Sequence, residues 1–416
     1  MDLTTLALDL TAADPAGLDL TDPVQLDRTQ AVADALLASG ADLETLRRLE
    51  GDLIERSAAV PLVLHVAVKM AVSRCTVLAL EGPAHVSVVF AVYKEHQRIL
   101  PLDRVAGGED FLVRKVAQLE WLLAGRDDLT WDMIVVDDGC PENSGGIAKD
   151  IAEEAGCADR VQVLMLAEAI AAGHPVTRPL TTADDSRKGG SIALGMWTAA
   201  ETARENHVVV FTDADLSTHL GQTGLLMGEI LEGGREAAIG SRREPRSVVI
   251  KQGVRNTRGK LFIYLWKRLI GNLPDIVDTQ CGFKGFSAEA VRAITPDLLE
   301  KKFAFDIELL IKIRLRGADS IAKVPVAWID SETLSTTTDI QPYLPMLQAM
   351  VKMYRIYLPA NPGADEFAAF IAGLDDAAWN RLVENIPEEI TKREPAEFGG
   401  FSGVSAADLG RAAGLG

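Results

Sequence analysis

The stretch HVVVFTDADLST, residues 207–218, decides the fold that this sequence predicts. It opens with a run of β-branched and aromatic residues that has no polar interruption, which is typical of a strand buried on both faces. The run ends at Asp213, Ala214 and Asp215, so two carboxylates stand where the strand stops. In open parallel sheets, ligands bind outside the carboxyl ends of the strands. The stretch therefore predicts a parallel sheet with an acidic ligand site at one edge.

Other short apolar runs repeat this pattern and alternate with helical segments. The runs at 86–92, 133–138, 161–166 and 237–242 have the same strand-like composition. Strands that alternate with helices indicate an α/β fold with a mostly parallel central sheet covered on both faces. Further along the chain we expect a helix over 248–270, a strand at 281–287, a helix over 305–316, a strand at 322–329 and a helix over 343–357.

The two ends of the chain differ from this central part. We expect a helical N-terminal extension over 1–83, a catalytic domain over 84–335, and a helical, acidic C-terminal extension over 336–416. The net charge of the chain is −18. Residues 1–60 and 361–416 carry most of it, so the central part is nearly neutral. Such a charge argues against nucleic acid as a partner, because neutralising phosphates requires an excess of Lys and Arg.

The cysteines and the apolar segments indicate a cytoplasmic protein. The four cysteines lie far apart in sequence, and the first residues lack the pattern of a signal peptide. The apolar run 58–80 contains His65, Lys69 and Arg74, which are costly inside a bilayer. We therefore expect a buried or amphipathic helix pair there and no transmembrane span. A location peripheral to the membrane and a homodimer stay open.

The acidic triplet at the end of the 207–213 strand has the chemistry of a metal site. Two carboxylates two residues apart can hold a hard divalent cation, Mg²⁺ or Mn²⁺, together with phosphate oxygens of a ligand. We expect Asp213 and Asp215 to bind this cation and Ala214 to face the same ligand. An isolated Asp-x-Asp is more often an exposed turn, so the prediction depends on the strand before it.

Two other strand ends bring polar residues to the same edge. Asp137 and Asp138 follow the strand at 133–138, and Tyr93 and Glu95 follow the strand at 86–92. A tyrosine ring can stack on a nucleobase, and carboxylates can accept hydrogen bonds from the base or the ribose. The alternative for the acidic pair is a helix cap or a tight turn, where Asp is common.

Basic residues supply two candidate contacts for phosphate. Arg187, Lys188 and Gly189 open a helix, where backbone N–H groups and the helix dipole favour an anion. Residues 241–270 contain nine bases and one acid, and this reversal of charge includes Arg242 and Arg243. A phosphate-rich ligand or an anionic membrane surface would explain it. The alternative is a solvated helical face.

Seven segments together resemble the family 2 glycosyltransferases of the GT-A type, and polyprenyl-phosphate sugar transferases such as dolichyl-phosphate glucosyltransferase most of all. The resemblance covers about residues 86–328. Its segments are VSVVFAVYKEHQRI (86–99), IVVDDG (134–139), KGGSIALGM (188–196), VVFTDADLST (209–218), GSRR (240–243), DTQCGFKGF (278–286) and FAFDIELL (303–310).

This resemblance implies a Rossmann-like nucleotide-diphospho-sugar transferase fold and a UDP- or GDP-sugar donor. It places Tyr93, Glu95 and Asp137 at the nucleoside and Lys188 beside it. It also places Asp278, Gln280 and Asp306 on the side of the donor sugar and the acceptor, where Asp306 or Asp278 would be the catalytic base.

The chain departs from the family after Trp328, where IDSETLSTT (329–337) replaces the usual pattern on the acceptor side. We therefore expect an inverting, metal-dependent transferase that acts on a soluble small molecule in a biosynthetic pathway. A polyprenyl-phosphate acceptor at the membrane surface is the first alternative. A sugar nucleotidyltransferase and a non-catalytic protein that binds nucleotide sugars are the others.

Overall fold

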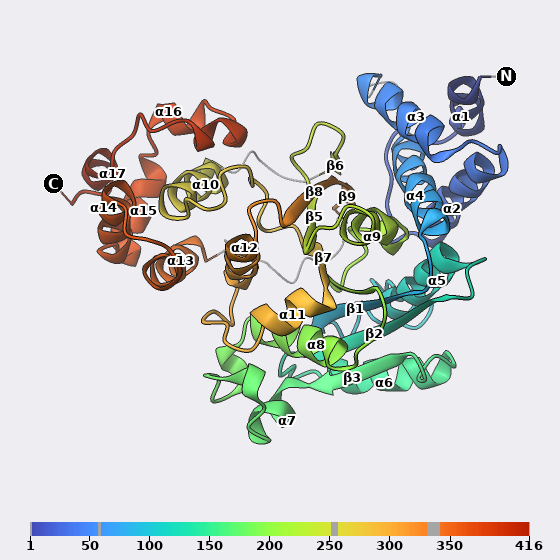
Figure 1. Cartoon of the computed structure of the whole chain (residues 1–416), viewed down its shortest axis with the longest axis horizontal. Helices are drawn as coiled ribbons and strands as arrows, with labels where there is room; N and C mark the ends of the chain where they lie inside the picture. Colours follow the sequence, from blue (N-terminus) through green and yellow to red (C-terminus); the bar gives the residue numbers. More distant parts are fainter. Residues whose placement is uncertain (1, 57–59, 251–256, 331–341, 416) are drawn as a thin grey trace.

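The computed structural model describes residues 2–56, 60–250, 257–330 and 342–415. Its centre is a seven-stranded sheet with the strand order β3-β2-β1-β4-β7-β5-β8 (Figure 1). Strand β7 is antiparallel to both of its neighbours, and the other pairs are parallel. This confirms an α/β fold with a mostly parallel sheet. The strands are β1 (Ala84–Val92), β2 (Leu129–Asp137), β3 (Val161–Met165), β4 (His207–Thr212), β5 (Ala237–Ser241), β7 (Phe283–Ser287) and β8 (Ile321–Pro325).

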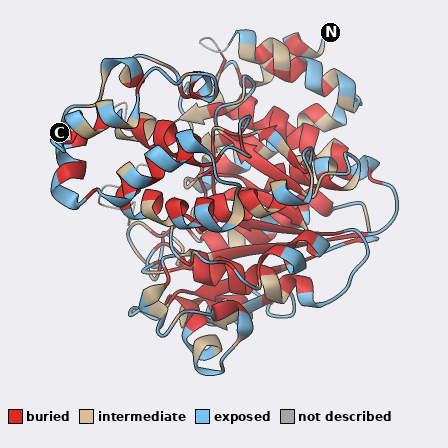
Figure 2. Cartoon of the chain, turned by 60° about the vertical axis from the view of Figure 1, so that its left-hand side comes forward, coloured by how far each residue is buried: buried red, intermediate tan, exposed pale blue. Residues whose placement is uncertain are grey.

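Helices cover both faces of the sheet, and alternate residues of one strand enter two different cores. On β1, Val88 and Phe90 belong to one hydrophobic cluster and Val89 to the other, and all three are fully buried. The strands of the sheet are buried over most of their length (Figure 2). This is why the strands contain few polar residues. The covering helices are α5 (Phe111–Leu123), α6 (Ser144–Glu154), α7 (Leu166–Ala171), α8 (Gly189–Glu201), α9 (Thr223–Leu231), α11 (Ala288–Ile294) and α12 (Phe305–Arg316).

The N-terminal extension forms part of the main core. It consists of α1 (Leu3–Thr11), α2 (Pro23–Ala38), α3 (Leu43–Glu55) and α4 (Leu62–Ala79). The prediction of two helices over 58–80 is wrong, because the described residues of this run form one helix, α4. Among the described residues, α4 alone is long and apolar enough to cross a membrane, but 72% of it is buried inside the protein. Its Lys69 ammonium lies 2.5 Å from a carboxylate oxygen of Glu50.

The predicted helix over 248–270 begins later than expected. The β-branched residues Val248–Ile250 form strand β6, which pairs in parallel with β9 (Ala327–Ile329). Helix α10 spans Thr257–Leu269, and residues 251–256 lie outside the described part of the chain. The predicted strand at 322–329 is divided into β8 and β9, because β8 pairs with β5 in the main sheet whereas β9 pairs with β6 in a separate two-stranded sheet.

The C-terminal extension packs around α10 on one side of the sheet (Figure 1). Residues 331–341 are not described, so the predicted boundary at 335 and most of the divergent segment at 329–337 lie outside the described residues. The extension contains α13 (Tyr343–Tyr357), α14 (Pro362–Ala372), α15 (Asp376–Glu384), α16 (Glu388–Thr391) and α17 (Ala406–Ala412).

The amino end of β4 generates a prediction about acid stability. Burial is the main reason that the pKa of His207 is lowered from 6.5 to about 4. The unfolded chain would therefore bind a proton on this ring below about pH 6.5, whereas the folded chain would bind it only near pH 4. The free energy of unfolding should consequently fall as the pH drops through this range, by up to about 1.4 kcal/mol per unit for this ring.

Urea denaturation of the wild type and of His207→Gln between pH 7 and pH 4.5 measures this effect. The free energy of unfolding of the variant should depend less steeply on pH, by about the amount that the binding of one proton contributes. Identical slopes for the two proteins would show that His207 does not stay neutral in the folded state.

Candidate active site

The polar residues predicted at the strand ends meet at one edge of the sheet. Strands β1, β2, β4 and β5 end there, and the antiparallel strand β7 begins there. Backbone hydrogen bonds fix the neighbouring ends, since the N–H of Asp138 donates to the carbonyl of Val92 and the N–H of Asp213 donates to the carbonyl of Gly282, each at 3.1 Å. The edge therefore assembles the acidic residues from three parallel strands.

Asp213 is the residue on which most of these contacts converge. Its carboxylate forms an ion pair with the ammonium of Lys188, and its side chain is 32% exposed. Burial by itself would raise the pKa of Asp213, but Lys188 and more distant cations hold it below its usual value. A Cβ on Gly282 would overlap the Asp213 carboxylate, so any other residue would force this side chain to shift.

Asp215 is held through its backbone. Its carbonyl accepts a 2.7 Å hydrogen bond from the ammonium of Lys115, which is fully buried on α5. Burial lowers the pKa of Lys115 to about 8. One Asp215 carboxylate oxygen accepts a hydrogen bond from the N–H of Ser217 at 3.0 Å, and the side chain is half-buried.

These two carboxylates fit a hard cation that shares its remaining ligands with a phosphate. No cluster of three or more His, Cys, Asp or Glu side chains suited to a metal occurs in the part of the chain that the structure describes. Mg²⁺ is commonly bound by one or two carboxylates together with substrate phosphates and water. The donor set of Asp213 and Asp215 is of this kind, so the sequence prediction of the metal ligands stays a prediction that the geometry allows.

The loop before α8 differs from the predicted anion cradle. The N–H groups of Arg187 and Gly190 donate to the carbonyl of Lys301 at 3.3 and 2.9 Å, and the N–H of Lys188 donates to Asp138 at 2.9 Å. These donors are therefore already used. Arg187 is exposed and Gly189 is buried, so a phosphate would meet side chains here and not the backbone.

Lys188 itself has an uncommon backbone conformation, with φ at 84°. Asp138 holds it there, because its second oxygen accepts a 2.7 Å hydrogen bond from the hydroxyl of Ser191. Strained backbone is retained where the surroundings fix it, often at functional sites. Asp138 thus positions Lys188 toward Asp213.

Asp137 caps a helix, as the sequence-based alternative proposed. Its two oxygens accept hydrogen bonds from the N–H groups of Cys140 and Gly145, both at 2.7 Å, and the residue is 1% exposed. A nucleoside contact would have to share these oxygens. Asp137 therefore fixes the start of α6 beside the site.

Glu95 belongs to a buried chain of charges that the sequence did not reveal. The guanidinium of Arg98 lies 3.0 Å from Glu95 and 2.8 Å from Glu109. Burial raises the pKa of Glu95 to about 7, although Arg98 opposes the shift, and the negative charge of Asp215 adds to it. Tyr93 is half-buried at the same strand end, and its contact with a nucleobase stays a prediction.

The two predicted catalytic bases have opposite environments. Asp278 forms a bidentate ion pair with Arg242, with both distances at 2.8 Å. Burial would raise the pKa of Asp278, but Arg242 outweighs it and lowers this pKa to about 2. Asp306 is 6% exposed and lies 3.1 Å from the fully buried ammonium of Lys284. Burial raises the pKa of Asp306 in spite of Lys284, so Asp306 is the better proton acceptor.

Two polar groups near Arg242 have no partner in the described part of the chain. The Nε2 atom of Gln280 is buried without a hydrogen bond, and Arg243 is exposed with no ion pair. Buried polar groups are normally bonded, so Gln280 is a candidate for a ligand contact. Arg242 also lies over the ring of Trp328, at 5.3 Å from its centroid.

Three other bases of the 241–270 segment donate hydrogen bonds to backbone carbonyls. Lys260 donates to the carbonyls of Thr391 and Arg393 at 3.0 and 2.8 Å. Lys267 and Arg268 likewise donate to backbone carbonyls, and Lys251 and Arg255 lie outside the described residues. At the strand ends, Arg242 and Arg243, which follow β5, stay the predicted ligand contacts of this segment.

Sequence reasoning missed the buried partners of the site: Arg98, Glu109, Lys115 and Lys284. Lys284 could have been noticed, since a lysine between two aromatic residues of an apolar strand needs a buried partner. Arg98, Glu109 and Lys115 occur in segments with ordinary helical or loop patterns, and nothing local indicates their partners.

Comparisons with known proteins agree with the resemblance, although no protein-family model matches the chain. The dolichyl-phosphate β-glucosyltransferase ALG5C of Trichomonas vaginalis is 27% identical over 260 residues, which are 59% of this chain and 65% of that protein. The glycosyltransferase AglD of Haloferax volcanii is 29% identical over 243 residues, 58% of this chain and 33% of that protein. The chain thus covers less than two thirds of either relative.

Two further similarities extend over more of the chain. The dolichyl-phosphate β-glucosyltransferase of Drosophila melanogaster is 26% identical over 294 residues, 68% of this chain and 77% of that protein. A crystal structure of glucosyl-3-phosphoglycerate synthase from Mycobacterium tuberculosis, in complex with Mn²⁺, UDP-glucose and phosphoglyceric acid, has a TM-score of 0.46 at 18% identity and covers 70% of this chain and 85% of that one. The predicted similarity to dolichyl-phosphate glucosyltransferases is confirmed.

The contact between Gly282 and Asp213 generates a prediction about stability. Gly282→Ala should lower the free energy of unfolding by about 1–3 kcal/mol, the usual cost of forcing extra volume into a packed site. The matched control is Gly17→Ala, where the added methyl group meets no atom within 4 Å. Chemical denaturation of the three proteins measures the difference. Equal stabilities would show that the Asp213 carboxylate can move away at no cost.

Proposed function

We propose that this chain is an inverting, metal-dependent glycosyltransferase that moves a sugar from a nucleotide-diphosphate donor to an acceptor. The observation that carries the proposal is the group of charges around Asp213, which brings two carboxylates and Lys188 to the carboxyl end of β4. The similarity to enzymes named as glucosyltransferases supports the reaction class.

Asp213 and Asp215 would hold the divalent cation, whose chemistry is to neutralise a leaving diphosphate. Lys188 adds a positive charge next to Asp213, which would also attract the leaving phosphate. Arg98 and Lys115 fix the surrounding backbone and carboxylates by buried contacts. A site that is fixed in this way stabilises charge as it develops without reorganising.

Asp306 is the residue that we assign to proton transfer. A hydroxyl of the acceptor would give its proton to the Asp306 carboxylate while its oxygen forms a bond to the anomeric carbon. The bond from that carbon to the donor diphosphate breaks, its electron pair leaves with the diphosphate, and the configuration inverts. Lys284 holds the Asp306 carboxylate in position from the opposite side.

We further propose a soluble acceptor and a cytoplasmic location. Helix α10 buries its apolar residues against the C-terminal helices, so this face is covered by protein and not offered to lipid. The acidic flanks would also repel anionic headgroups. The alternative acceptor, a polyprenyl phosphate, is favoured by the dolichyl-phosphate relatives and by Arg243, an exposed base that has no ion pair among the described residues.

The metal requirement is tested by chelation. Turnover of a nucleotide-diphosphate sugar should stop in EDTA and return with excess Mn²⁺ or Mg²⁺, and Asp215→Asn should lower it by about 10²-fold or more, a usual scale for losing a group that stabilises the transition state. Asp185→Asn is the control, because this half-buried aspartate accepts hydrogen bonds only from its own turn in the described part of the chain. Full activity in EDTA would contradict the requirement for a divalent cation. Release of diphosphate from a nucleoside triphosphate and a sugar 1-phosphate, with no nucleoside diphosphate formed from the nucleotide sugar, would indicate a nucleotidyltransferase.

The base is tested by comparing two buried aspartates. Asp306→Asn should lower kcat by about 10²-fold or more on a soluble alcohol acceptor, with donor affinity unchanged. Asp278→Asn breaks a comparable buried ion pair but should act mainly on KM, through Arg242. If transfer occurs only to polyprenyl phosphate in vesicles, and Asp306→Asn keeps wild-type kcat, the soluble acceptor and the base are both wrong.

A further inference from the structure

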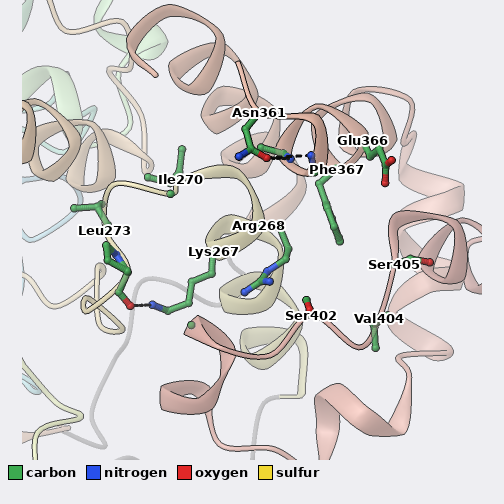
Figure 3. A pocket seen from close by; sticks show the side chains of 15 residues that line it. Lys267, Arg268, Ile270, Leu273, Asn361, Glu366, Phe367, Ser402, Val404 and Ser405 are labelled. Carbon is green, nitrogen blue, oxygen red and sulfur yellow. Dashed lines mark hydrogen bonds between the residues drawn. The ribbon is translucent and has the colours of Figure 1, made fainter. Parts of the chain in front are cut away.

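A second cavity lies far along the chain from the strand ends, between α10 and the C-terminal helices (Figure 3). Its volume is about 380 Å³, which is within the range of small-molecule sites. One wall is the carboxyl end of α10 with the loop that follows, and the other is the start of α14 with the segment before α17. The cavity therefore lies between the predicted catalytic domain and the C-terminal extension.

Two adjacent cations line this cavity without a carboxylate partner in the described part of the chain. Lys267 is only 9% exposed, and its ammonium uses one of three hydrogens, in a 2.9 Å bond to the carbonyl of Pro274. Arg268 donates through Nη2 to the carbonyl of Phe398, while its Nε atom is buried with no hydrogen-bond partner. Each cation also lies over an aromatic ring of α10, at 4.9 and 5.3 Å from the ring centroids, but these contacts leave N–H donors of both groups unused.

The facing wall adds neutral donors and an apolar surface. The Asn361 side chain accepts hydrogen bonds from the N–H groups of Gly363 and Ala364, which leaves its amide NH₂ available. Ser402 contributes a hydroxyl, and the buried Phe367 contributes an aromatic face (Figure 3). Among the described residues, Glu366 is the one acid that lines the cavity, and it is exposed.

A purely structural role explains only part of this arrangement. Cations at the carboxyl end of a helix interact favourably with its dipole and with free carbonyls. That accounts for one bond from Lys267 and one from Arg268. It does not account for a buried guanidinium nitrogen without an acceptor, since such groups are rarely left unbonded. Burial also lowers the pKa of Lys267 to about 8, and an anion in the cavity would oppose this shift.

We propose that this cavity is a second ligand site, which binds a small organic phosphate or carboxylate. The anionic group would contact Lys267, Arg268 and Asn361, and the apolar body would lie against Phe367. This site is separate from the one at the strand ends and does not depend on the function proposed for it.

Three variants that each change the net charge by −1 test the site. Asn361→Asp keeps the cap of α14, since Asp caps helices as well as Asn does, but it puts a carboxylate where the anion would bind. Arg268→Gln removes the guanidinium. Lys352→Gln is the control, because this exposed lysine of α13 does not line the cavity. Phenyl phosphate, benzoate and the neutral phenol are titrated calorimetrically into the full chain, with and without saturating nucleoside diphosphate.

Phenyl phosphate or benzoate should bind, whether or not nucleoside diphosphate is present, and Asn361→Asp and Arg268→Gln should weaken that anion at least tenfold. Lys352→Gln should leave its affinity within twofold, and whichever anion binds tighter identifies the natural class. Asn361→Asp decides the test if Arg268→Gln does not fold. Phenol binding as tightly as either anion, equal effects of all three variants, displacement by nucleoside diphosphate, or no binding of either anion at millimolar concentration would each overturn the proposal.

Discussion

The ion pair between Asp213 and Lys188 is the interaction on which the candidate active site depends. It requires a glycine at 282 on one side and the strained backbone of Lys188 on the other, which Asp138 holds through its hydrogen bonds. Charges removed from water are tolerated when they are paired and bonded. Because each carboxylate here has a cation or a backbone donor nearby, the edge of the sheet can keep several negative charges in a small volume.

The need to pair buried charges also explains why two similar aspartates, Asp278 and Asp306, differ in pKa. Asp278 and Asp306 are both buried aspartates on the same side of the site, and each faces one cation. Arg242 binds Asp278 through two parallel hydrogen bonds and one from its backbone, so Asp278 stays ionised and unreactive as a base. Lys284 donates one hydrogen bond to Asp306 and another to a backbone carbonyl. The effect of burial on the pKa of Asp306 therefore outweighs that of Lys284. Environments that separate the pKa values of two carboxylates commonly assign them separate roles.

The sequence could predict what is repeated and local. Apolar runs that end in Asp213 or Asp137 predict the strands and the edge at which they meet. This is possible because the spacing of apolar residues, which indicates a buried strand, can be read within one segment. The capping of α6 by Asp137 was available only as an alternative, since the same residue type serves turns, caps and ligands. Contacts between distant segments could not be predicted, as for Lys115, which reaches the backbone of Asp215 from another helix. The sequence-based prediction missed strand β6 for a related reason, because this strand depends on its pairing with β9, a distant segment of the chain.

The C-terminal extension changes what the basic segment can do. In isolation, α10 is an amphipathic helix with Lys260, Lys267 and Arg268 beside buried aromatic residues, a composition suited to an anionic membrane surface. Here the C-terminal helices cover that apolar face, and their carbonyls accept hydrogen bonds from Lys260 and Arg268. A lipid surface would have to displace these contacts before it could bind the helix. The bases that remain available are therefore those near β5, at the acceptor side, and those that line the second cavity.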